Sequence, residues 1–411
     1  MTEYREKVLK EKLSEDSFKC NIMQGDLWQM YLNKVKHKNV FPLIIYFDEF
    51  ETCNPLGSHA GVYKQGAVYF SIASLPQQYT TRLENIFLVM LFHSDDRITF
   101  GNKAVFDILI NELKYLEDKG IAINCNGNVE QVYFSMVLLI GDNLGLHSLY
   151  GLVESFQANF YCRFCKCHKH DMKKLCKEEQ TLLRTVDEYD EMVLEKSYGI
   201  KEKCVFHDLP NFHIFNNLTC DIMHDLSEGV HRYGLAKVIE SLISQNFFSL
   251  DYLNQRIQFF NYNSSEKNKP PPLKANHIKE GCIILSSSEM MCLVLNLRLI
   301  VGDLVPENNE VWGYYLLLLE ITEIVIASSI SSPTIELLKS LIEQHNHLYV
   351  HLFKDNLKPK FHFLLHYPRI ISKVGPLCNI QTIRFEAKHK ELKTTAYVTS
   401  SREKMVHLLF H

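Results

Sequence analysis

The first 150 residues alternate between short apolar runs and polar connections. Four runs rich in β-branched and aromatic residues occupy positions 41–48, 67–74, 85–92 and 132–140. Because their apolar positions are consecutive, we expect strands of a sheet that is covered on both faces. Residues 102–119 place apolar side chains at helical spacing, and Gly120 ends that pattern. The order therefore predicts three strands, a helix and a fourth strand.

From about residue 150 to residue 380 the apolar positions recur with the helical period instead. The expected helices cover residues 221–244, 288–301, 310–327, 334–353 and 362–372. Two segments rich in helix breakers, 261–272 and 328–333, separate some of them. A further helix is expected from Thr382 onward. This pattern predicts an α/β protein with a large, mainly α-helical insertion before its C-terminal helix.

Composition narrows the class of protein. The chain has 411 residues, 46% of them hydrophobic, and a formal net charge of -4. These values exclude a disordered chain and a protein that coats nucleic acid with positive charge. No apolar run reaches the length of a membrane span, and the first residues are charged where a secretory signal would be apolar. We expect a soluble protein of a reducing compartment, in which close pairs among its 12 cysteines are candidate metal ligands.

Two aspartates follow apolar runs that are expected to become neighbouring strands. Asp48 closes the first run and Asp142 follows the fourth, so both carboxylates are expected at one edge of the sheet. Glu386, in the expected C-terminal helix, can complete the group. Two Mg²⁺ or Mn²⁺ ions would neutralise three such carboxylates and activate the attacking and leaving oxygens in phosphoryl transfer. Two alternatives stay open: an aspartate after a strand is often a helix cap, and Glu49 and Glu51 compete with Asp48.

A pair of cysteines and a pair of histidines lie near opposite ends of the insertion. The Cys-x-x-Cys motif is Cys162 and Cys165, and the His-x-x-x-His motif is His362 and His366. On one helix, residues i and i+4 share a face, so both imidazoles can reach one ion. Two thiolates and two imidazoles make a closed tetrahedral zinc site, which would join the two ends of the insertion.

A local metal site is the alternative. It would be a small knuckle without the distant histidine pair, built from the cysteines and histidines that crowd the segment after the Cys-x-x-Cys motif, namely Cys167, His168, His170 and Cys176.

Taken in order, these motifs resemble those of a known family. The stretches that carry the likeness are YFDEFETCNPLGS (46–58), GAVYF (66–70), SLP (74–76), GDNLGLH (141–147), CRFC (162–165), DIMHDLSEG (221–229), HFLLHYPR (362–369) and RFEAKH (384–389). The chain resembles the catalytic core of CACTA-type (En/Spm-like) DDE transposases. That group is related to the Transib transposases and to the catalytic subunit of the V(D)J recombinase.

The resemblance implies an RNase H-like (DDE integrase/transposase) fold in four parts. These are an N-terminal helical lead-in (1–40), the first part of the RNase H-like core (41–150), a zinc-pinned helical insertion (151–375) and a C-terminal helix completing the core (376–411). The resemblance also implies roles for seven residues. The catalytic triad binding two Mg²⁺ or Mn²⁺ ions would be Asp48, Asp142 and Glu386, and the ligands of one structural Zn²⁺ would be Cys162, Cys165, His362 and His366.

The implied reaction is in-line attack on DNA phosphodiesters, first by water and then by a 3′-hydroxyl. The implied partners are double-stranded DNA, as transposon ends and target, and a second copy of the chain in a homodimer, with a nuclear location. The alternative is a catalytically inactive or truncated transposase-derived protein that binds DNA or another protein, because no helix-turn-helix or zinc finger precedes the core. A stand-alone nuclease for RNA–DNA hybrids is a third reading, and it leaves the large insertion without a role.

Positive charge gathers near the C-terminus, where lysines and arginines outnumber the four acids of residues 351–411. Clustered cations of this kind favour a DNA track around Glu386, because phosphate contacts supply most of the affinity for DNA. A solvated helix face is the alternative explanation. The candidate DNA contacts are His147, Arg384, Lys388 and His389. The motif Met223-His224-Asp225 receives no mechanism from the sequence.

Overall fold

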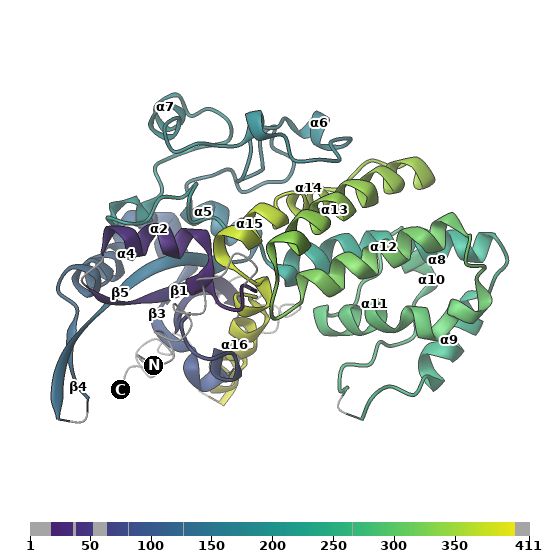
Figure 1. Cartoon of the computed structure of the whole chain (residues 1–411), viewed down its shortest axis with the longest axis horizontal. Coiled ribbons are helices and arrows are strands. Elements are labelled where there is room, and N and C mark those ends of the chain that lie inside the picture. The colour runs from purple at the N-terminus through teal and green to yellow at the C-terminus, as the bar shows by residue number, and fades with distance from the viewer. Residues whose placement is uncertain are drawn as a thin grey trace.

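The computed structural model describes residues 18–35, 38–51, 64–80, 82–125, 127–264 and 266–398 of the chain. A mixed sheet and its covering helices form one part, and a bundle of long helices extends from it (Figure 1). The five strands are β1 (Asn39–Glu51), β2 (Lys64–Ile72), β3 (Phe87–His93), β4 (Ile121–Cys125) and β5 (Asn128–Gly141), in the order β3-β2-β1-β5-β4. The prediction of an α/β fold is confirmed.

The strands divide into an antiparallel half and a parallel pair. β2 runs antiparallel to both of its neighbours, β1 and β3, whereas β5 lies parallel to β1 on its other side. The expected order of three strands, a helix and a strand is therefore present. β4 was not expected from the sequence, because its five residues carry too short an apolar pattern. It forms a hairpin with β5 that turns at Gly127, whose φ is +88°.

Helix α4 (Ser94–Asp118) covers one face of the sheet. Side chains alternate along a strand, so every second residue of β1 faces this helix. The Phe47 ring meets the Phe106 ring of α4 edge to face, with centroids 5.9 Å apart. The helix starts earlier than expected, because a second helical segment joins it across Gly101, and its chain leaves through Gly120 at φ +66° as expected.

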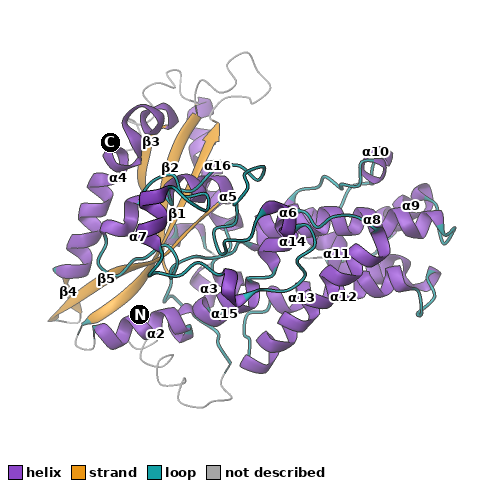
Figure 2. Cartoon of the chain, turned by 90° about the horizontal axis from the view of Figure 1, so that it is seen from above, coloured by secondary structure: helices purple, strands orange, loops and turns teal. Residues whose placement is uncertain are grey.

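Helix α16 (Ile383–Val398) covers the opposite face, where Figure 2 shows it beside β1 and β2. Its Phe385 stacks on Tyr46 with ring centroids 4.8 Å apart, and its His389 packs 4.6 Å from the Phe50 ring. Because the pleat has a period of two, Asp48 shares this face with Tyr46 and Phe50. The sheet is therefore covered on both faces, and α16 lies over the C-terminal part of β1, which carries Asp48.

The chain is mainly helical from residue 222 onward, as expected, but residues 151–220 form mostly turns and loops with a few short helices, unlike the prediction. Helix α12 is apolar on nearly all sides because it is buried between α8, α11 and α13. The principal helices there are η6 (Ile222–Val230, a π-helix), α8 (His231–Ser244), α9 (Leu250–Phe259), α10 (Ala275–Lys279), α11 (Ser287–Val301), α12 (Glu310–Val325) and α13 (Ser332–Phe353). The segment between α9 and α10 has no regular structure in its described residues, in agreement with the expected loop.

The return from the bundle to the sheet differs from the prediction. Instead of one helix over 362–372, the chain forms α14 (Pro359–Leu364) and α15 (Tyr367–Val374). The break comes just before Pro368, because proline is favoured in the first turn of a helix and disrupts the helix interior. The two short helices set the direction in which the chain re-enters the sheet layer.

The remaining helices are short or lie near the N-terminus. α2 falls in the expected lead-in and packs against α15, while the part of the lead-in before residue 18 lies outside the described residues. These helices are α2 (Asp26–Lys34), α3 (Gln77–Thr80), α5 (Asn143–Leu149), α6 (Lys169–Met172) and α7 (Tyr189–Glu195). None of the described helices combines the length and the apolar character that crossing a membrane requires.

Candidate metal centre and acid cluster

The cysteine pair and the histidine pair meet in space. The ligand atoms of Cys162, Cys165, His362 and His366 all lie within 4.8 Å of one another, and all four residues are buried. Cys165 Sγ is 3.1 Å from His362 Nε2, and Cys162 Sγ is 3.5 Å from His366 Nε2. The predicted union of these two motifs is confirmed, and the cluster can hold a metal ion.

The local fold presents these ligands in two different ways. The cysteines sit in a tight turn, in which the Phe164 N–H points at Cys162 Sγ, 3.4 Å away. His362 belongs to α14, but His366 lies in the turn between α14 and α15. The expectation that one continuous helix carries both imidazoles is therefore wrong, although the two still converge.

Two buried arginines lie beside the thiols. Arg163 is 1% exposed and Arg184 is 6% exposed, and the hydrogen bonds described for both go to uncharged groups. A buried guanidinium is stabilised by a nearby anion, and the Cys162 thiolate can supply it here. Burial alone would raise the pKa of Cys162, but the Cys165 thiol and the His366 and His362 imidazoles lower it well below its ordinary value. The site thus favours the thiolate, the form that binds metals, at Cys162. The hydrogen bond to Cys162, together with burial, raises the pKa of Cys165 well above its ordinary value.

A carboxylate behind the cluster orients one of the histidines. Glu178 Oε1 accepts a hydrogen bond from His366 Nδ1 at 2.5 Å and one from Arg369 Nε at 3.0 Å. The bond at Nδ1 leaves Nε2 directed at the cysteines, which is how outer carboxylates prepare histidine for a metal. Sequence reasoning missed Glu178, since one acid in a charged segment carries no distinguishing pattern.

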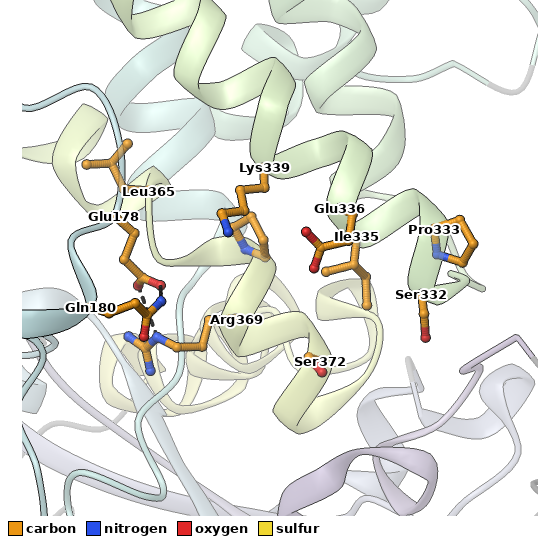
Figure 3. Close-up of a pocket in the computed structure, with 11 residues that line it drawn as sticks. Glu178, Gln180, Ser332, Pro333, Ile335, Glu336, Lys339, Leu365, Arg369 and Ser372 are labelled. Atoms are coloured by element: carbon orange, nitrogen blue, oxygen red, sulfur yellow. Dashed lines mark hydrogen bonds and ion pairs between the residues drawn. The ribbon is translucent and has the colours of Figure 1, made fainter. Parts of the chain in front are cut away.

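Figure 3 shows Glu178 and Arg369 at one end of a cavity of about 510 Å³, which α13 and α15 border. Glu178, which accepts the hydrogen bond of His366, is one of the residues that line this cavity. The ligand atoms themselves remain buried. A closed set of four protein ligands is typical of a structural site, whereas a catalytic zinc keeps an open position.

The local knuckle receives less support. The Cys167 thiol donates to the His168 carbonyl at 3.7 Å, and the Cys176 thiol donates to the Lys174 carbonyl at 3.4 Å. Among the described residues, the group of potential ligands that converges does not include these two cysteines. The geometry therefore favours the split site.

Asp48 lies on the face of β1 that α16 covers. The strand was expected to end at Asp48. Instead it continues to Glu51, because β2 pairs with it as far as Lys64. Tyr46 Oη donates to Asp48 Oδ2 at 3.2 Å, and the Glu49 N–H donates to Asp48 Oδ1 at 2.8 Å. Burial raises the pKa of Asp48 to about 7, with further contributions from the Asp142 and Glu386 charges.

Asp142 follows β5 directly and caps α5. Its Oδ1 accepts a hydrogen bond from the Gly145 N–H, so the cap that the sequence left as an alternative is present. A Cβ atom at position 145 would lie 2.5 Å from this oxygen, which explains the glycine. A cap uses one lone pair of one oxygen, and the carboxylate keeps further lone pairs for other ligands.

Glu386 lies in the first turn of α16 and contacts η6 of the insertion. Its Oε1 is 3.3 Å from His224 Nε2, and His224 Nδ1 is 2.8 Å from Asp221 Oδ2. Burial lowers the pKa of His224, but the hydrogen bonds to Asp221 and Glu386 raise it well above its ordinary value. A protonated His224 therefore bridges the two carboxylates. This assigns a place to the motif that the sequence left without a mechanism.

The three acids come from β1, the start of α5 and α16, and they lie close enough for their charges to shift the pKa of Asp48. Among the described residues, however, only the Cys/His cluster brings three or more ligand atoms within 4.8 Å of one another. The three acids are not part of a group of this kind among the described residues. The competitor Glu49 pairs instead with Arg97 at 2.9 Å and Lys64 at 2.8 Å.

The candidate DNA contacts divide into two buried and two accessible residues. His147 is 0% exposed and binds the Val153 carbonyl, while His389 is 3% exposed and lies 3.6 Å from Asp48 Oδ2. A phosphate cannot reach either imidazole in this structure, which corrects the prediction for both. Arg384 is exposed, and Lys388 pairs with Glu391 at 2.7 Å.

Comparison with known proteins adds no family to this description: no family model matches the chain, and no curated protein matches it either.

Proposed function

We propose that this chain is the catalytic core of a DNA transposase of the DDE type, similar to the CACTA group. It would cleave and join DNA phosphodiesters with two Mg²⁺ or Mn²⁺ ions held by Asp48, Asp142 and Glu386. The observation that carries the proposal is that α16 packs over Asp48 on β1, with Phe385 stacked on Tyr46 and His389 3.6 Å from the Asp48 carboxylate, so that acids from three separate elements lie near one another. An acid whose pKa is raised by burial and by acids from other elements is typical of functional sites.

The topology supports an RNase H-like assignment as part of the same proposal. Three antiparallel strands, a helix and a strand parallel to the first are the elements such a core requires, and β1, β2, β3, α4 and β5 supply them. α16 then contributes its acid after the long helical segment. The insertion of residues 151–375 thus separates two parts of one catalytic layer.

The chain's own residues would orient the acids before DNA arrives. Tyr46 holds Asp48, the Gly145 N–H holds Asp142, and His224 holds Glu386. Divalent ions bound there would supply activation of the attacking oxygen and charge neutralisation at the leaving oxygen. Because the pKa of Asp48 is about 7, a cation competes with a proton for this carboxylate near neutral pH.

Zinc in the Cys/His cluster is the structural part of the proposal. The donor set of two thiolates and two imidazoles is one that zinc prefers, and all four donors are buried. A zinc ion there would tie the loop after α5 to the helices that return to α16. Its binding free energy would then contribute to folding.

DNA cleavage tests the proposal directly. Purified full-length chain should nick supercoiled plasmid with Mn²⁺, and Asp142→Asn should lower the rate at least 100-fold because an ion ligand is lost. Glu49→Gln is the matched control, since this acid neighbours Asp48 but pairs with Arg97 and Lys64. It should leave the rate unchanged. Absence of nicking by the wild-type chain, or full activity of Asp142→Asn, contradicts the proposal.

A non-catalytic derivative is the second candidate, and it is favoured because the three acids are not among the described residues found to converge closely enough to hold a metal ion. Such a protein would use the same fold to bind double-stranded DNA or a protein partner. A gel-shift assay separates the two, because DNA binding with no cleavage in Mn²⁺ supports the derivative. A homodimer and a nuclear location are proposals that accompany the transposase reading, and light scattering tests the first.

A further inference from the structure

A buried polar chain leads from the Cys/His cluster to the Asp142 turn. Arg163 stands between the two cysteines of the Cys-x-x-Cys motif and is 1% exposed. Its guanidinium donates to Asn143 Oδ1 and, at 2.8 Å, to the Thr219 carbonyl. Asn143 directly follows Asp142 and opens α5. One side chain thus links a metal-ligand turn to the residue beside a proposed catalytic acid.

The histidine side of the cluster reaches the same place by another route. Lys360 lies on α14, two residues before His362, and its Nζ is 3.2 Å from Asp225 Oδ1. Asn143 Nδ2 donates to that same oxygen at 2.9 Å. Asp225 is 1% exposed. A positively charged side chain near each ligand pair therefore contacts the Asn143–Asp225 pair: Arg163 on the cysteine side and Lys360 on the histidine side.

Both ends of the Asn143 side-chain amide form hydrogen bonds. Its oxygen accepts from Arg163 and its nitrogen donates to Asp225, so the side chain has one stable orientation. Leaving either buried partner without its hydrogen bond is costly, and the network resists partial rearrangement. Because Asn143 is the residue next to Asp142, its orientation sets the backbone from which the Asp142 carboxylate projects.

We propose that Arg163 and Asn143 are positioning residues that make divalent-ion binding at Asp142 depend on an occupied Cys/His cluster. The inference rests on the proposed function, because it assumes that Asp142 is an ion ligand. An ion in the cluster holds the Cys-x-x-Cys turn, the turn holds Arg163, and Arg163 holds Asn143 against Asp225. Loss of that ion then loosens the acid site, although the two sites share no ligand.

Arg184 provides the internal comparison. It is also buried beside the cluster, but its guanidinium donates to the Cys162 carbonyl at 2.9 Å and the Tyr198 carbonyl at 2.6 Å. None of its hydrogen bonds goes to Asn143. An effect shared by both arginines would report packing around the cluster, whereas an effect of Arg163 alone reports the link to Asp142.

The experiment measures Mn²⁺ affinity by electron paramagnetic resonance on full-length chain that carries one zinc per molecule. Zinc content and thermal unfolding are recorded for each variant, and Asp142→Asn sets the level without the acid site. We expect Asn143→Ala and Arg163→Met to keep zinc and to weaken Mn²⁺ binding about 10-fold, the usual effect of removing an outer-shell partner. The double variant should be no weaker than either single one, because both act through one link. Arg163→Lys should recover part of the affinity.

Arg184→Met is the matched control and should leave Mn²⁺ affinity unchanged where zinc is retained. If zinc-loaded Asn143→Ala and Arg163→Met bind Mn²⁺ as the wild type does, the inference fails while the proposed function stands. Additive losses in the double variant also overturn it. If the wild-type chain binds no Mn²⁺ above the level of Asp142→Asn, the acid site and the proposed function fail first. Should Arg163→Met not fold, Asn143→Ala alone decides the outcome, since it leaves the cluster intact.

Discussion

At the scale of single residues, the acid site is defined by what holds each carboxylate. Tyr46, the Gly145 N–H and a protonated His224 each fix one acid. Asp48 is partly buried beneath α16, and this burial is the largest cause of its raised pKa. Its ionisation is therefore coupled to the stability of the fold.

Replacing Asp48 tests this coupling. The pKa is about 7 in the folded chain against 3.8 for an unperturbed aspartate, so the wild-type fold loses stability as the pH rises from about 4 to 7. In buffer without Mg²⁺, Asp48→Asn should be more stable than wild type by about 2–4 kcal/mol at pH 8 and equal to it at pH 4. Urea unfolding at the two pH values measures the difference. Equal stability at both would show that Asp48 ionises without cost.

At the scale of elements, η6 acts as the contact between the insertion and α16. The Asp221 side chain accepts hydrogen bonds from the Thr382 N–H at 2.9 Å and the Thr382 hydroxyl at 2.8 Å, at the start of α16. Its neighbour His224 reaches Glu386 on the same helix. A π-helix displaces side chains relative to the α-helical repeat and is often found at functional sites. Here it directs successive polar residues to different partners.

We expect His224→Ala to lower the rate of Mn²⁺-dependent nicking by roughly 10- to 100-fold, because Glu386 loses the group that orients it. Asp221 keeps its hydrogen bonds from Thr382, so zinc content and helix content should not change. His347→Ala on α13 is the control, since that side chain is 65% exposed. Nicking at the wild-type rate by His224→Ala would remove this histidine from the site.

At the scale of the whole molecule, the Cys/His cluster joins segments that are far apart in the chain. It connects the loop after α5 with the turn between α14 and α15, near the point where the helical bundle returns to the sheet (Figure 1). A metal ion at this junction would restrain the bundle relative to the sheet. The effect of its loss should therefore be global rather than local.

Zinc content and stability of cysteine variants test this role. Cys162→Ser should lose the one zinc ion and lower the free energy of unfolding by on the order of 5 kcal/mol. Cys176→Ser, a buried cysteine outside the cluster, should keep it. Atomic absorption and thermal unfolding measure the two effects. Retention of zinc by His366→Ala, with loss from Cys176→Ser, would establish the local knuckle instead.

Much of the fold could be predicted from the sequence because it depends on local periodicity. Consecutive apolar residues predicted β1, β2, β3 and β5, and helical spacing predicted α4, α11, α12 and α13. The failures had local causes as well. β4 is too short to show a pattern, and the helix that apolar periodicity predicted over 362–372 is broken just before Pro368.

The sequence by itself determined which chemical groups are available: two cysteines in one turn, two histidines four residues apart, and acids beside strands and in a helix. Only the tertiary structure decided which of them meet. It selected the split Cys/His cluster over the local one and buried His147 and His389. It also gave His224, Arg163 and Glu178 their partners. The reason is physical: periodicity is a property of neighbours along the chain, whereas a site depends on packing between segments that the sequence keeps far apart.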